Sequence, residues 1–302
     1  MSSNIRPSCF DEIIGQKDVV NRLKIMASGC LNSGGAMPHT LIDGPPGLGK
    51  TTIAGAIANH LGVNLYTVNA ANIRSIKNLL PYLMGLERNS VLFIDEIHRL
   101  PKIVEEFLYP IMEDFVLNIL VKDKEDKDKP ETIDIPPFTL VGATTSGGSL
   151  SQPFYDRFII KEHLSFYTPS ELAKLAELNV KKLGLNVSEN ELLEIAQRSK
   201  GTPRILNARL QWYKNYVAYH NDKVVSVDEI FNSQGIDNRG LDKYDRLYID
   251  ILKKSKGNPL GLKSISSMTG IAIDTIENSI EPYLIRNGFV IRTQKGRILG
   301  NI

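Results

Sequence analysis

The chain has 302 residues, of which 42% are hydrophobic and 23% charged, and it carries 36 Lys and Arg against 34 Asp and Glu. This length predicts two domains or three small ones, and the composition excludes a collagen, a disordered chain and a disulfide scaffold. No run of about 18 apolar residues is present and the first 20 residues lack a signal-peptide core, so we expect a cytoplasmic protein with no membrane segment. Cys9 and Cys30 lack metal-ligand spacing and are expected to be reduced.

The first half of the chain alternates short β-rich runs with longer helical patterns. This alternation is typical of a parallel sheet covered by helices, so we predict an α/β domain over residues 1–166. Val91–Ile94 is continuously apolar, as expected of a strand that is buried on both faces. The expected strands are His39–Asp43, Leu65–Asn69, Val91–Asp95, Phe138–Ala143 and Phe158–His163.

One segment of this domain stands out by its charge. Lys122–Glu131 reads KDKEDKDKPE, with nine charged residues in ten. A segment of that composition buries nothing, so we expect an exposed loop or hairpin tip between strands Phe115–Val121 and Thr132–Ile135.

The strand signal fades after residue 166, and helix starts replace it. Thr168 with Glu171 opens one helix, and Ser188 with Glu191 forms a second capping box. We therefore predict a small helical domain over residues 167–237.

The last unit, residues 238–302, has the pattern of a winged helix. Helices are expected near 242–255, 260–269 and 273–286, and the strands Phe289–Arg292 and Arg297–Leu299 flank the turn Thr293–Gly296. The unit has 11 Lys and Arg against 6 Asp and Glu, so it is the part expected to meet a polyanion.

A nucleotide-binding motif follows the strand His39–Asp43. The residues Gly44, Pro45, Pro46, Gly47, Leu48, Gly49, Lys50 and Thr51 fit G-x-x-x-x-G-K-[ST] and precede a helical pattern. The glycines let backbone N–H groups close around phosphate oxygens, Lys50 can reach the β- and γ-phosphates, and Thr51 can ligate Mg²⁺. The motif predicts a site for ATP and Mg²⁺, which also includes Thr52.

Two acidic residues, Asp95 and Glu96, lie at the end of the strand Val91–Asp95. Ligands bind at the carboxyl ends of strands in an open α/β sheet, so Asp95 can hold the metal and Glu96 can polarise an attacking water. The alternative for Glu96 is an ordinary acid at a helix start, where the dipole stabilises it. His98 is assigned no role. A two-lobed helicase is disfavoured, because the residues after Thr168 are too few for a second motor lobe.

Three further residues complete a candidate ATPase site. Thr145 follows the strand Phe138–Ala143, where its hydroxyl can bind the γ-phosphate or its water. Arg157 lies at a loop-to-strand border, and Arg204 lies in the first turn of a helix. Each arginine by itself is expected on the surface. Together, behind a P-loop and an acidic pair, they fit the two cations of a ring ATPase, one from a neighbouring subunit and one from its own helical lid.

The motifs GPPGLGKT, VLFIDEIHRL, FTLVGATT, YDRF and GTPR, taken in order, resemble those of the AAA+ ATPases. The finer matches resemble one family, RuvB, the motor of Holliday junction branch migration, and they run from about residue 6 to 298. They include Arg6-Pro7, Phe10–Gln16, Val104–Asp114, Phe166–Pro169, Gly240–Asp242 and Glu281–Ile285. The resemblance implies an α/β AAA+ core, a helical lid, a C-terminal winged helix and a DNA-dependent ATPase of recombination and repair.

The resemblance also implies roles residue by residue. Lys50 and Thr51 contact phosphates and Mg²⁺, Asp95 holds Mg²⁺, and Glu96 is the catalytic carboxylate. Thr145 is sensor 1, Arg157 is the arginine finger acting in trans, and Arg204 is sensor 2. The implied adenine-side residues are Arg6, Ile13, Ile14 and Tyr167. The implied DNA contacts in the wing are Arg292, Lys295 and Arg297, which are expected to have no acidic residues nearby. They would contact DNA phosphates, so binding should weaken as salt is raised and depend little on the DNA sequence.

The implied partners are duplex DNA, Holliday junctions, five further copies in a hexameric ring, and the junction-binding protein RuvA. Two departures from the family pattern bear on them. The hairpin by which the family docks on RuvA is apolar and rich in small residues, whereas here it carries KDKEDKDKPE, so this partner is altered or absent. Tyr155 stands where the family has an arginine two residues before the finger.

Two alternatives share the AAA+ core. One is an initiator-like protein that uses ATP as a switch for sequence-specific DNA binding. The other is a clamp-loader subunit, which would end in a helical collar rather than a wing.

Overall fold

The computed structural model describes residues 6–122, 128–220 and 225–300. The chain divides into two compact units: unit 1 is Met1–Gly44 with Gly49–Ser165, and unit 2 is Pro45–Leu48 with Phe166–Ile302. The middle of the predicted phosphate loop therefore groups with the helical half of the chain. Within the described ranges, no helix is long and apolar enough to cross a membrane.

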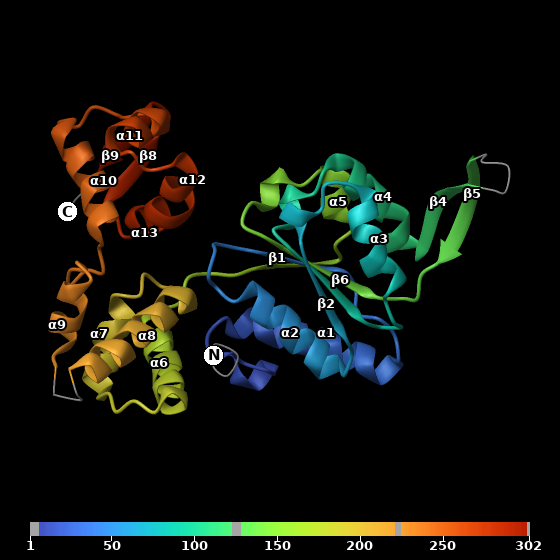
Figure 1. Ribbon diagram of the computed structural model, residues 1–302, viewed down its shortest axis with the longest axis horizontal. Helices are drawn as coiled ribbons and strands as arrows, with labels where there is room; N and C mark the ends of the chain where they lie inside the picture. The colour runs from blue at the N-terminus through green and yellow to red at the C-terminus, as the bar shows by residue number, and fades with distance from the viewer. Residues whose placement is uncertain (1–5, 123–127, 221–224, 301–302) are drawn as a thin grey trace. The chain divides into compact units, whose positions relative to one another are not determined.

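A parallel sheet of five strands forms the centre of unit 1, in the order β2-β3-β6-β1-β7 (Figure 1). Each predicted strand is present, and the boundaries differ from the predictions by at most two residues. The strands are β1 (Thr40–Asp43), β2 (Leu65–Asn69), β3 (Val91–Asp95), β6 (Thr139–Thr144) and β7 (Ile160–His163). The apolar run of β3 is buried on both faces, as predicted.

Helices cover both faces of this sheet. In Figure 1, α1 (Lys17–Ser33) and α2 (Lys50–Leu61) lie along one face, and α3 (Ile76–Met84), α4 (Lys102–Glu113) and α5 (Gln152–Asp156) lie along the other. The second layer packs on the sheet through a continuous hydrophobic core that includes Leu79, Leu83, Leu92, Ile94, Val104, Leu108, Ile111 and Phe154. This core fixes β3 and β6, whose carboxyl ends carry the predicted catalytic residues.

His39, just before β1, holds a position that the sequence did not indicate. Its Nδ1 accepts the N–H of Leu140 at 2.9 Å and its Nε2 donates to the carbonyl oxygen of Met112 at 2.9 Å, which fixes the neutral tautomer. Burial lowers the pKa of this imidazole below its ordinary value of 6.5.

We expect His39 to make the stability of unit 1 dependent on pH. Below pH 6.5 the imidazole of the unfolded chain becomes protonated, whereas that of the folded protein stays neutral. The free energy of unfolding therefore falls by about 1.4 kcal/mol per pH unit until the pKa of the folded state is reached. His39→Gln should be less stable than wild type at pH 7.5, and the gap should narrow at pH 5.5. Urea unfolding at the two pH values measures this, and an unchanged gap would contradict the assignment.

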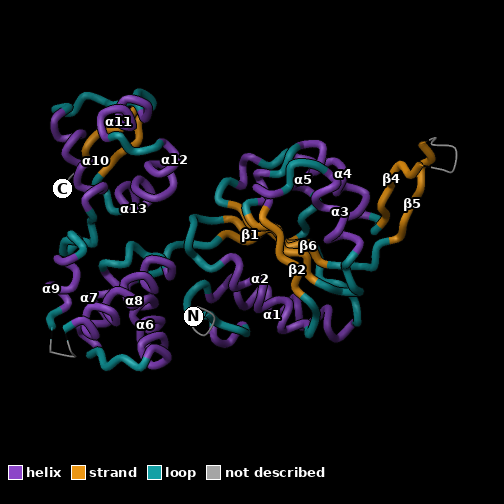
Figure 2. The backbone as a smooth tube through the Cα atoms, in the orientation of Figure 1, coloured by secondary structure: helices purple, strands orange, loops and turns teal. Residues whose placement is uncertain are grey.

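The predicted pair of strands is present, and the second begins inside the charged segment, at Asp128 rather than at Thr132. β4 (Val116–Lys122) pairs antiparallel with β5 (Asp128–Asp134), with Val116 opposite Asp134 and Lys122 opposite Asp128. Figure 2 shows this two-stranded ribbon leaving the part of unit 1 that α3 and α4 cover. The middle of KDKEDKDKPE, residues 123–127, lies outside the described residues.

Four helices follow in unit 2: α6 (Pro169–Leu183), α7 (Glu189–Gln197), α8 (Pro203–Tyr219) and α9 (Val227–Ser233). Both predicted capping boxes are confirmed. The N–H of Glu171 donates to Thr168 Oγ1 at 3.2 Å while Thr168 N–H donates to the Glu171 carboxylate at 2.8 Å, and Ser188 and Glu191 repeat the arrangement.

The rest of unit 2 is a winged helix with its own hydrophobic core. It contains α10 (Lys243–Lys254), α11 (Leu262–Thr269) and the hairpin of β8 (Val290–Thr293) and β9 (Gly296–Leu299). The predicted helix 273–286 is present with these bounds, but its middle is π-helical: Ile276–Ile280 lies between α12 (Ile273–Thr275) and α13 (Glu281–Arg286). Pro282 lacks an N–H and cannot donate the next α-helical hydrogen bond, so the turn before it takes the wider π-helical form.

Candidate functional site

The ends of the phosphate loop belong to unit 1. Gly44 has φ 146°, and a Cβ there would lie 2.7 Å from the carbonyl oxygen of Leu164, so only glycine fits. Lys50 opens α2, is almost fully buried, and donates from Nζ to the carbonyl oxygen of Gly44 at 2.6 Å. Thr51 follows it in the first turn of α2. A buried ammonium and a helix N-terminus thus meet at the loop, which is the arrangement that binds phosphate.

The acidic pair lies at the same edge of the sheet as Thr145. Asp95 ends β3, and its Oδ1 accepts the N–H of Glu96 at 3.1 Å. Glu96 has a left-handed backbone, φ 51°, which turns its side chain back toward the neighbouring strand β6. The Thr145 hydroxyl donates to Glu96 Oε2 at 3.1 Å. The structure therefore brings together the predicted catalytic carboxylate and the predicted sensor 1.

His98, to which the sequence assigned no role, joins this group. Its Nδ1 lies 3.0 Å from the Thr144 hydroxyl and 3.4 Å from Glu96 Oε2. The His98 side chain is mostly buried. Its position three residues after Asp95, in a tight 3₁₀ turn, is the only local signal that could have indicated this contact.

The middle of the phosphate loop packs within unit 2. Gly47 has φ 83°, and a Cβ there would lie 2.9 Å from the Cβ of Arg204. The Arg204 N–H donates to the carbonyl oxygen of Gly47 at 3.3 Å. The Tyr167 hydroxyl donates to the carbonyl oxygen of Leu48 at 3.5 Å. Arg204 and Tyr167, which are about 120 to 160 residues away in sequence, are thus joined to the loop by the fold.

The other residues that were predicted to border the adenine lie near the N-terminus of unit 1. Arg6 is exposed, and Ile13 and Ile14 are half-buried beside the short 3₁₀ turn Phe10–Glu12. Phe10 is buried, with its ring 5.4 Å from that of His60 in α2. The contact between Phe10 and His60 anchors this N-terminal segment to α2, the helix that follows the phosphate loop.

Arg157 is held against its own unit. Its guanidinium lies 4.0 Å from the centre of the Tyr109 ring, pairs with Glu113 at 3.1 Å, and donates to the carbonyl oxygen of Pro153 at 2.8 Å. Its Nε is buried without a hydrogen-bond partner among the described residues. A buried donor left unsatisfied is costly, so this position of the side chain is not fully stabilised by its own unit.

Tyr155, which replaces the family's arginine, lines a separate cavity. The cavity has a volume of about 330 Å³ and lies against β1 and β7, with Asp43 and His163 also in its wall. Lys161 Nζ lies 4.3 Å from the centre of the Tyr155 ring. Neither Lys50 nor Glu96 lines it, so the nucleotide motif and this cavity are distinct places in unit 1.

The wing is not free of acids, which corrects the expectation from the sequence. Glu281, fully buried in α13, accepts from Arg292 Nε at 3.0 Å and from Arg297 Nε at 2.9 Å. Tyr248 donates to the same carboxylate at 2.7 Å. Burial favours the neutral acid, but the bonds from Arg297, Tyr248 and Arg292 outweigh it and lower the pKa of Glu281. Of the predicted DNA contacts, Lys295 is exposed, Arg292 is half exposed and Arg297 is largely buried.

A P-loop on a parallel sheet, an acidic pair with a hydroxyl sensor, a helical lid and a C-terminal wing define an AAA+ ATPase. Three family models match: "Holliday junction DNA helicase RuvB P-loop domain" over residues 5–164, "RuvB AAA lid domain" over 167–237, and "RuvB C-terminal winged helix domain" over 238–301. The chain belongs to the RuvB family.

Whole-chain relatives agree with this assignment. The Holliday junction branch migration complex subunit RuvB of Rhodopirellula baltica is 41% identical and covers 97% of this chain and 81% of its own, and that of Campylobacter hominis is 41% identical and covers 99% and 88%. The solved Thermotoga maritima RuvB Holliday junction branch migration motor has a TM-score of 0.87 at 36% identity, covering 98% of this chain and 96% of its own.

A more distant structure bears on the alternatives. The Aeropyrum pernix ORC2 protein matches with a TM-score of 0.63 at 15% identity, which shows a shared fold and nothing more about an initiator-like role. The clamp-loader alternative is wrong, because residues 243–299 form a winged helix rather than a helical collar.

Proposed function

We propose that this protein is an ATP-driven DNA motor that pumps duplex DNA to move Holliday junctions during recombination and repair. The observation that carries the proposal is the Thr145–Glu96 hydrogen bond at the edge of the sheet that also holds the phosphate loop. This hydroxyl and carboxylate are the parts of the site that act on water and the γ-phosphate rather than only binding nucleotide. The proposed functional domains are residues 1–166, 167–237 and 238–302, and the proposed location is the cytoplasm.

ATP is the proposed substrate and Mg²⁺ the proposed metal. Thr51 and Asp95 offer hydroxyl and carboxylate oxygens, the ligand type that Mg²⁺ prefers. Within the described ranges, no group of three or more His, Cys, Asp or Glu forms a cage, and Mg²⁺ at a nucleotide site uses few protein ligands because phosphates supply the rest. The residues therefore fit the ion, which when bound neutralises phosphate charge.

The chain's own groups divide the remaining work. Lys50 stabilises charge on the β- and γ-phosphates, and Glu96 orients the attacking water and accepts its proton. Thr145 holds the Glu96 carboxylate in place. Arg204 and Tyr167, packed on the phosphate loop, act from the lid side, with Arg6, Ile13 and Ile14 toward the adenine.

The ring and its trans contact are also proposed. Arg157 acts as the cation for the nucleotide of a neighbouring copy in a homo-hexamer around duplex DNA. Its unsatisfied Nε and its place at the end of a short helix support a side chain that exchanges Glu113 for a phosphate. Arg292 and Arg297 both pair with Glu281, but the Arg292 side chain is 51% exposed and that of Arg297 only 16%, so the wing grips DNA backbone chiefly through Lys295 and Arg292.

A RuvA-type partner is proposed to dock on the β4–β5 hairpin in a modified way. The family's hairpin is apolar, whereas the tip of this one is highly charged. A charged tip favours a partner surface of complementary charge and a contact that weakens as salt is raised.

The test is conversion of a labelled four-way junction into duplex products. At low ionic strength, with ATP and Mg²⁺, the wild-type protein should convert junctions of unrelated sequence at similar rates. A mass measurement under the same conditions checks that the ring has formed. Lys50→Ala should bind DNA but convert none. Sequence-specific binding with negligible ATP turnover would instead support the initiator-like alternative.

A further inference from the structure

A five-residue segment of unit 2, Lys200–Arg204, runs from the end of the α7–α8 connection into the first turn of α8. It has no role in the site described above except at its last residue. At that end, Arg204 packs on the phosphate loop through its bond to Gly47. At the other end, Lys200 Nζ pairs with Asp242 at 3.2 Å and with Asp245, which both belong to the start of α10 in the winged helix. One short segment therefore contacts both the nucleotide loop and the winged helix.

Of the two ion pairs at the winged-helix end, Lys200–Asp245 is buried, whereas the Asp242 side chain of the other is 36% exposed. Lys200 is 5% exposed and Asp245 is fully buried. Both carboxylates are also bonded to the backbone: Asp242 accepts the N–H groups of Tyr244 and Asp245, at 2.8 and 3.1 Å, and Asp245 accepts that of Asp242 at 2.8 Å. The lysine thus holds the first turn of α10 in one position and orientation.

This cluster is poorly explained as a device for stability alone. Burial raises the pKa of Asp245 despite its contact with Lys200, and Asp245 Oδ1 has no hydrogen-bond partner among the described residues. A buried ion pair pays a desolvation penalty that can exceed the attraction, and incomplete hydrogen bonding makes it worse. What such a pair does supply is a defined geometry between the elements that carry it.

A second contact ties the same segment to the winged helix. Arg286 of α13 donates to the carbonyl oxygen of Lys200 at 3.1 Å, and its guanidinium lies 4.1 Å from the centre of the Phe166 ring. A Cβ on Gly201, which has φ 75°, would lie 2.5 Å from Arg286 Nη1. The Tyr167 N–H donates to the carbonyl oxygen of Gly201 at 3.0 Å, so the backbone here is clamped from both sides.

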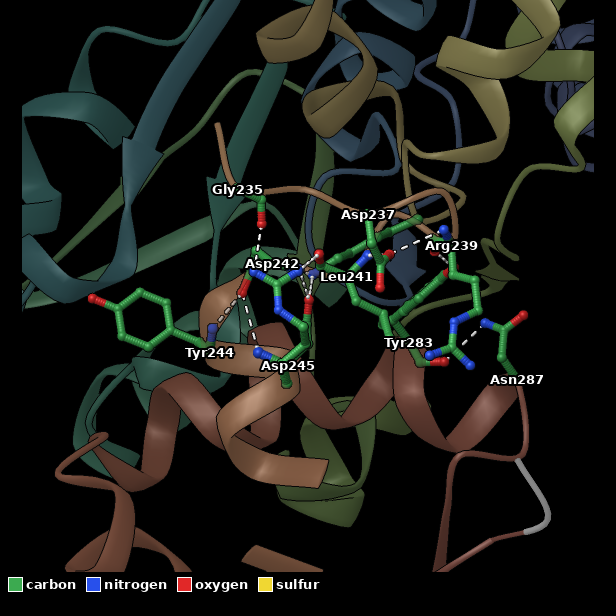
Figure 3. Close-up of polar contacts among 11 residues, drawn as sticks. Gly235, Asp237, Arg239, Leu241, Asp242, Tyr244, Asp245, Tyr283 and Asn287 are labelled. Atoms are coloured by element: carbon green, nitrogen blue, oxygen red, sulfur yellow. Dashed lines mark hydrogen bonds and ion pairs between the residues drawn. The ribbon is translucent and has the colours of Figure 1, made fainter. Parts of the chain in front are cut away.

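The covalent connection between α9 and α10 is equally constrained, as Figure 3 shows. Asp237 Oδ1 accepts the N–H groups of Arg239 and Leu241 at 3.0 and 2.8 Å. Arg246 donates to the carbonyl oxygens of Leu241 and Gly235 at 2.7 and 2.6 Å, and the Tyr283 hydroxyl donates to that of Arg239 at 2.6 Å. A connection bonded in this way does not act as a flexible tether.

We propose that Lys200–Arg204 is a relay that passes the state of the nucleotide loop to the winged helix, with Lys200 as the positioning residue at its DNA-side end. The inference rests on the proposed function, since it requires nucleotide at the P-loop and DNA on the wing. A shift of Gly47 moves Arg204. The segment Lys200–Pro203 before Arg204 is too short and too firmly hydrogen-bonded to absorb this shift. The winged helix therefore moves with the loop.

The relay makes a thermodynamic prediction that a purely structural contact does not. If nucleotide and DNA sites are coupled, the ratio of DNA affinities with a non-hydrolysable ATP analogue and with ADP differs from one, by about 5- to 150-fold for typical couplings. Loss of the coupling brings the ratio toward one. A contact that only stabilises the fold weakens DNA binding equally in both nucleotide states and leaves the ratio unchanged.

The experiment compares this ratio in the full-length wild type and in the double variant Lys200→Met with Asp245→Asn, which removes the pair without leaving a lone buried charge. Fluorescence anisotropy on a labelled duplex gives the affinities. The matched control is Arg198→Met with Asp228→Asn, which removes another buried cation two residues away whose partner lies in α9 rather than in the winged helix. ATP turnover without DNA is measured in all three proteins.

The relay variant should show a ratio within about twofold of one, an unchanged KM for ATP, and fewer junction steps per ATP hydrolysed. The control should keep the wild-type ratio. Should the double variant fail to fold in thermal unfolding, Arg286→Met tests the second contact with the same expected loss. A wild-type ratio retained in the variant, or a wild-type ratio of one in a protein that turns over ATP normally, would overturn the relay and leave the proposed ATPase standing.

Discussion

Replacing Arg157 with alanine is expected to lower kcat for ATP by about 10³- to 10⁵-fold while nucleotide binding persists. A trans cation stabilises charge that develops on the γ-phosphate in the transition state, so its loss slows chemistry far more than it weakens binding. Steady-state ATPase assays with duplex DNA present measure the effect. Arg88→Ala, an exposed arginine of the same unit, is the matched control and should leave kcat unchanged.

Mixing identifies the origin of that cation. Lys50→Ala and Arg157→Ala are each inactive, but an equimolar mixture assembles about a quarter of its interfaces from an intact Lys50 and an intact Arg157, because a ring contact is head-to-tail. Partial activity should therefore return. A mixture with no activity, or an Arg157→Ala protein that hydrolyses ATP at the wild-type rate, would show that the site is not shared.

Glu96→Gln is expected to lower kcat by about 10²- to 10⁴-fold, the usual contribution of a positioned general base. Glutamine keeps the shape of the side chain and still accepts the Thr145 hydroxyl, but it cannot take a proton from water. Single-turnover hydrolysis and binding of a fluorescent ATP analogue separate the chemical step from affinity.

The control for Glu96 is Glu106→Gln, an exposed carboxylate on α4. It should keep the wild-type rate. If Glu96→Gln also kept it, Glu96 would be an ordinary acid at the start of a 3₁₀ turn, and the water would have to be activated by another group.

Much of the fold could be predicted because its signals are local. Strand β3 is a continuous apolar run, the phosphate loop combines its glycines with Lys50 at fixed spacing, and Thr168 with Glu171 forms a capping box within one helical turn. In each case the physical cause lies within a few residues of its effect. The π-helical turn before Pro282 shows the limit, since the helical period predicts the helix but not the local change in its hydrogen bonding.

The partners of charged side chains could not be predicted in the same way. Glu281 lies 11 residues before Arg292 and was counted only as one acid among six, yet it pairs with two of the three cations expected to be free. His98 carried no signal beyond its neighbours and lies against Glu96. The contact of Arg157 with the Tyr109 ring within its own unit likewise had no signal in the sequence.

By itself, the sequence determined the class of the protein, the order of its strands and helices, and the places of the P-loop motif and the acidic pair in that order. Only the tertiary structure decided which charges meet: Lys200 with Asp245 across 45 residues, Glu281 with the wing, and Arg204 with Gly47. The physical reason is range. Backbone bonding and hydrophobic periodicity act between near neighbours in the chain, whereas an ion pair depends on which distant elements the packing of the core brings into contact.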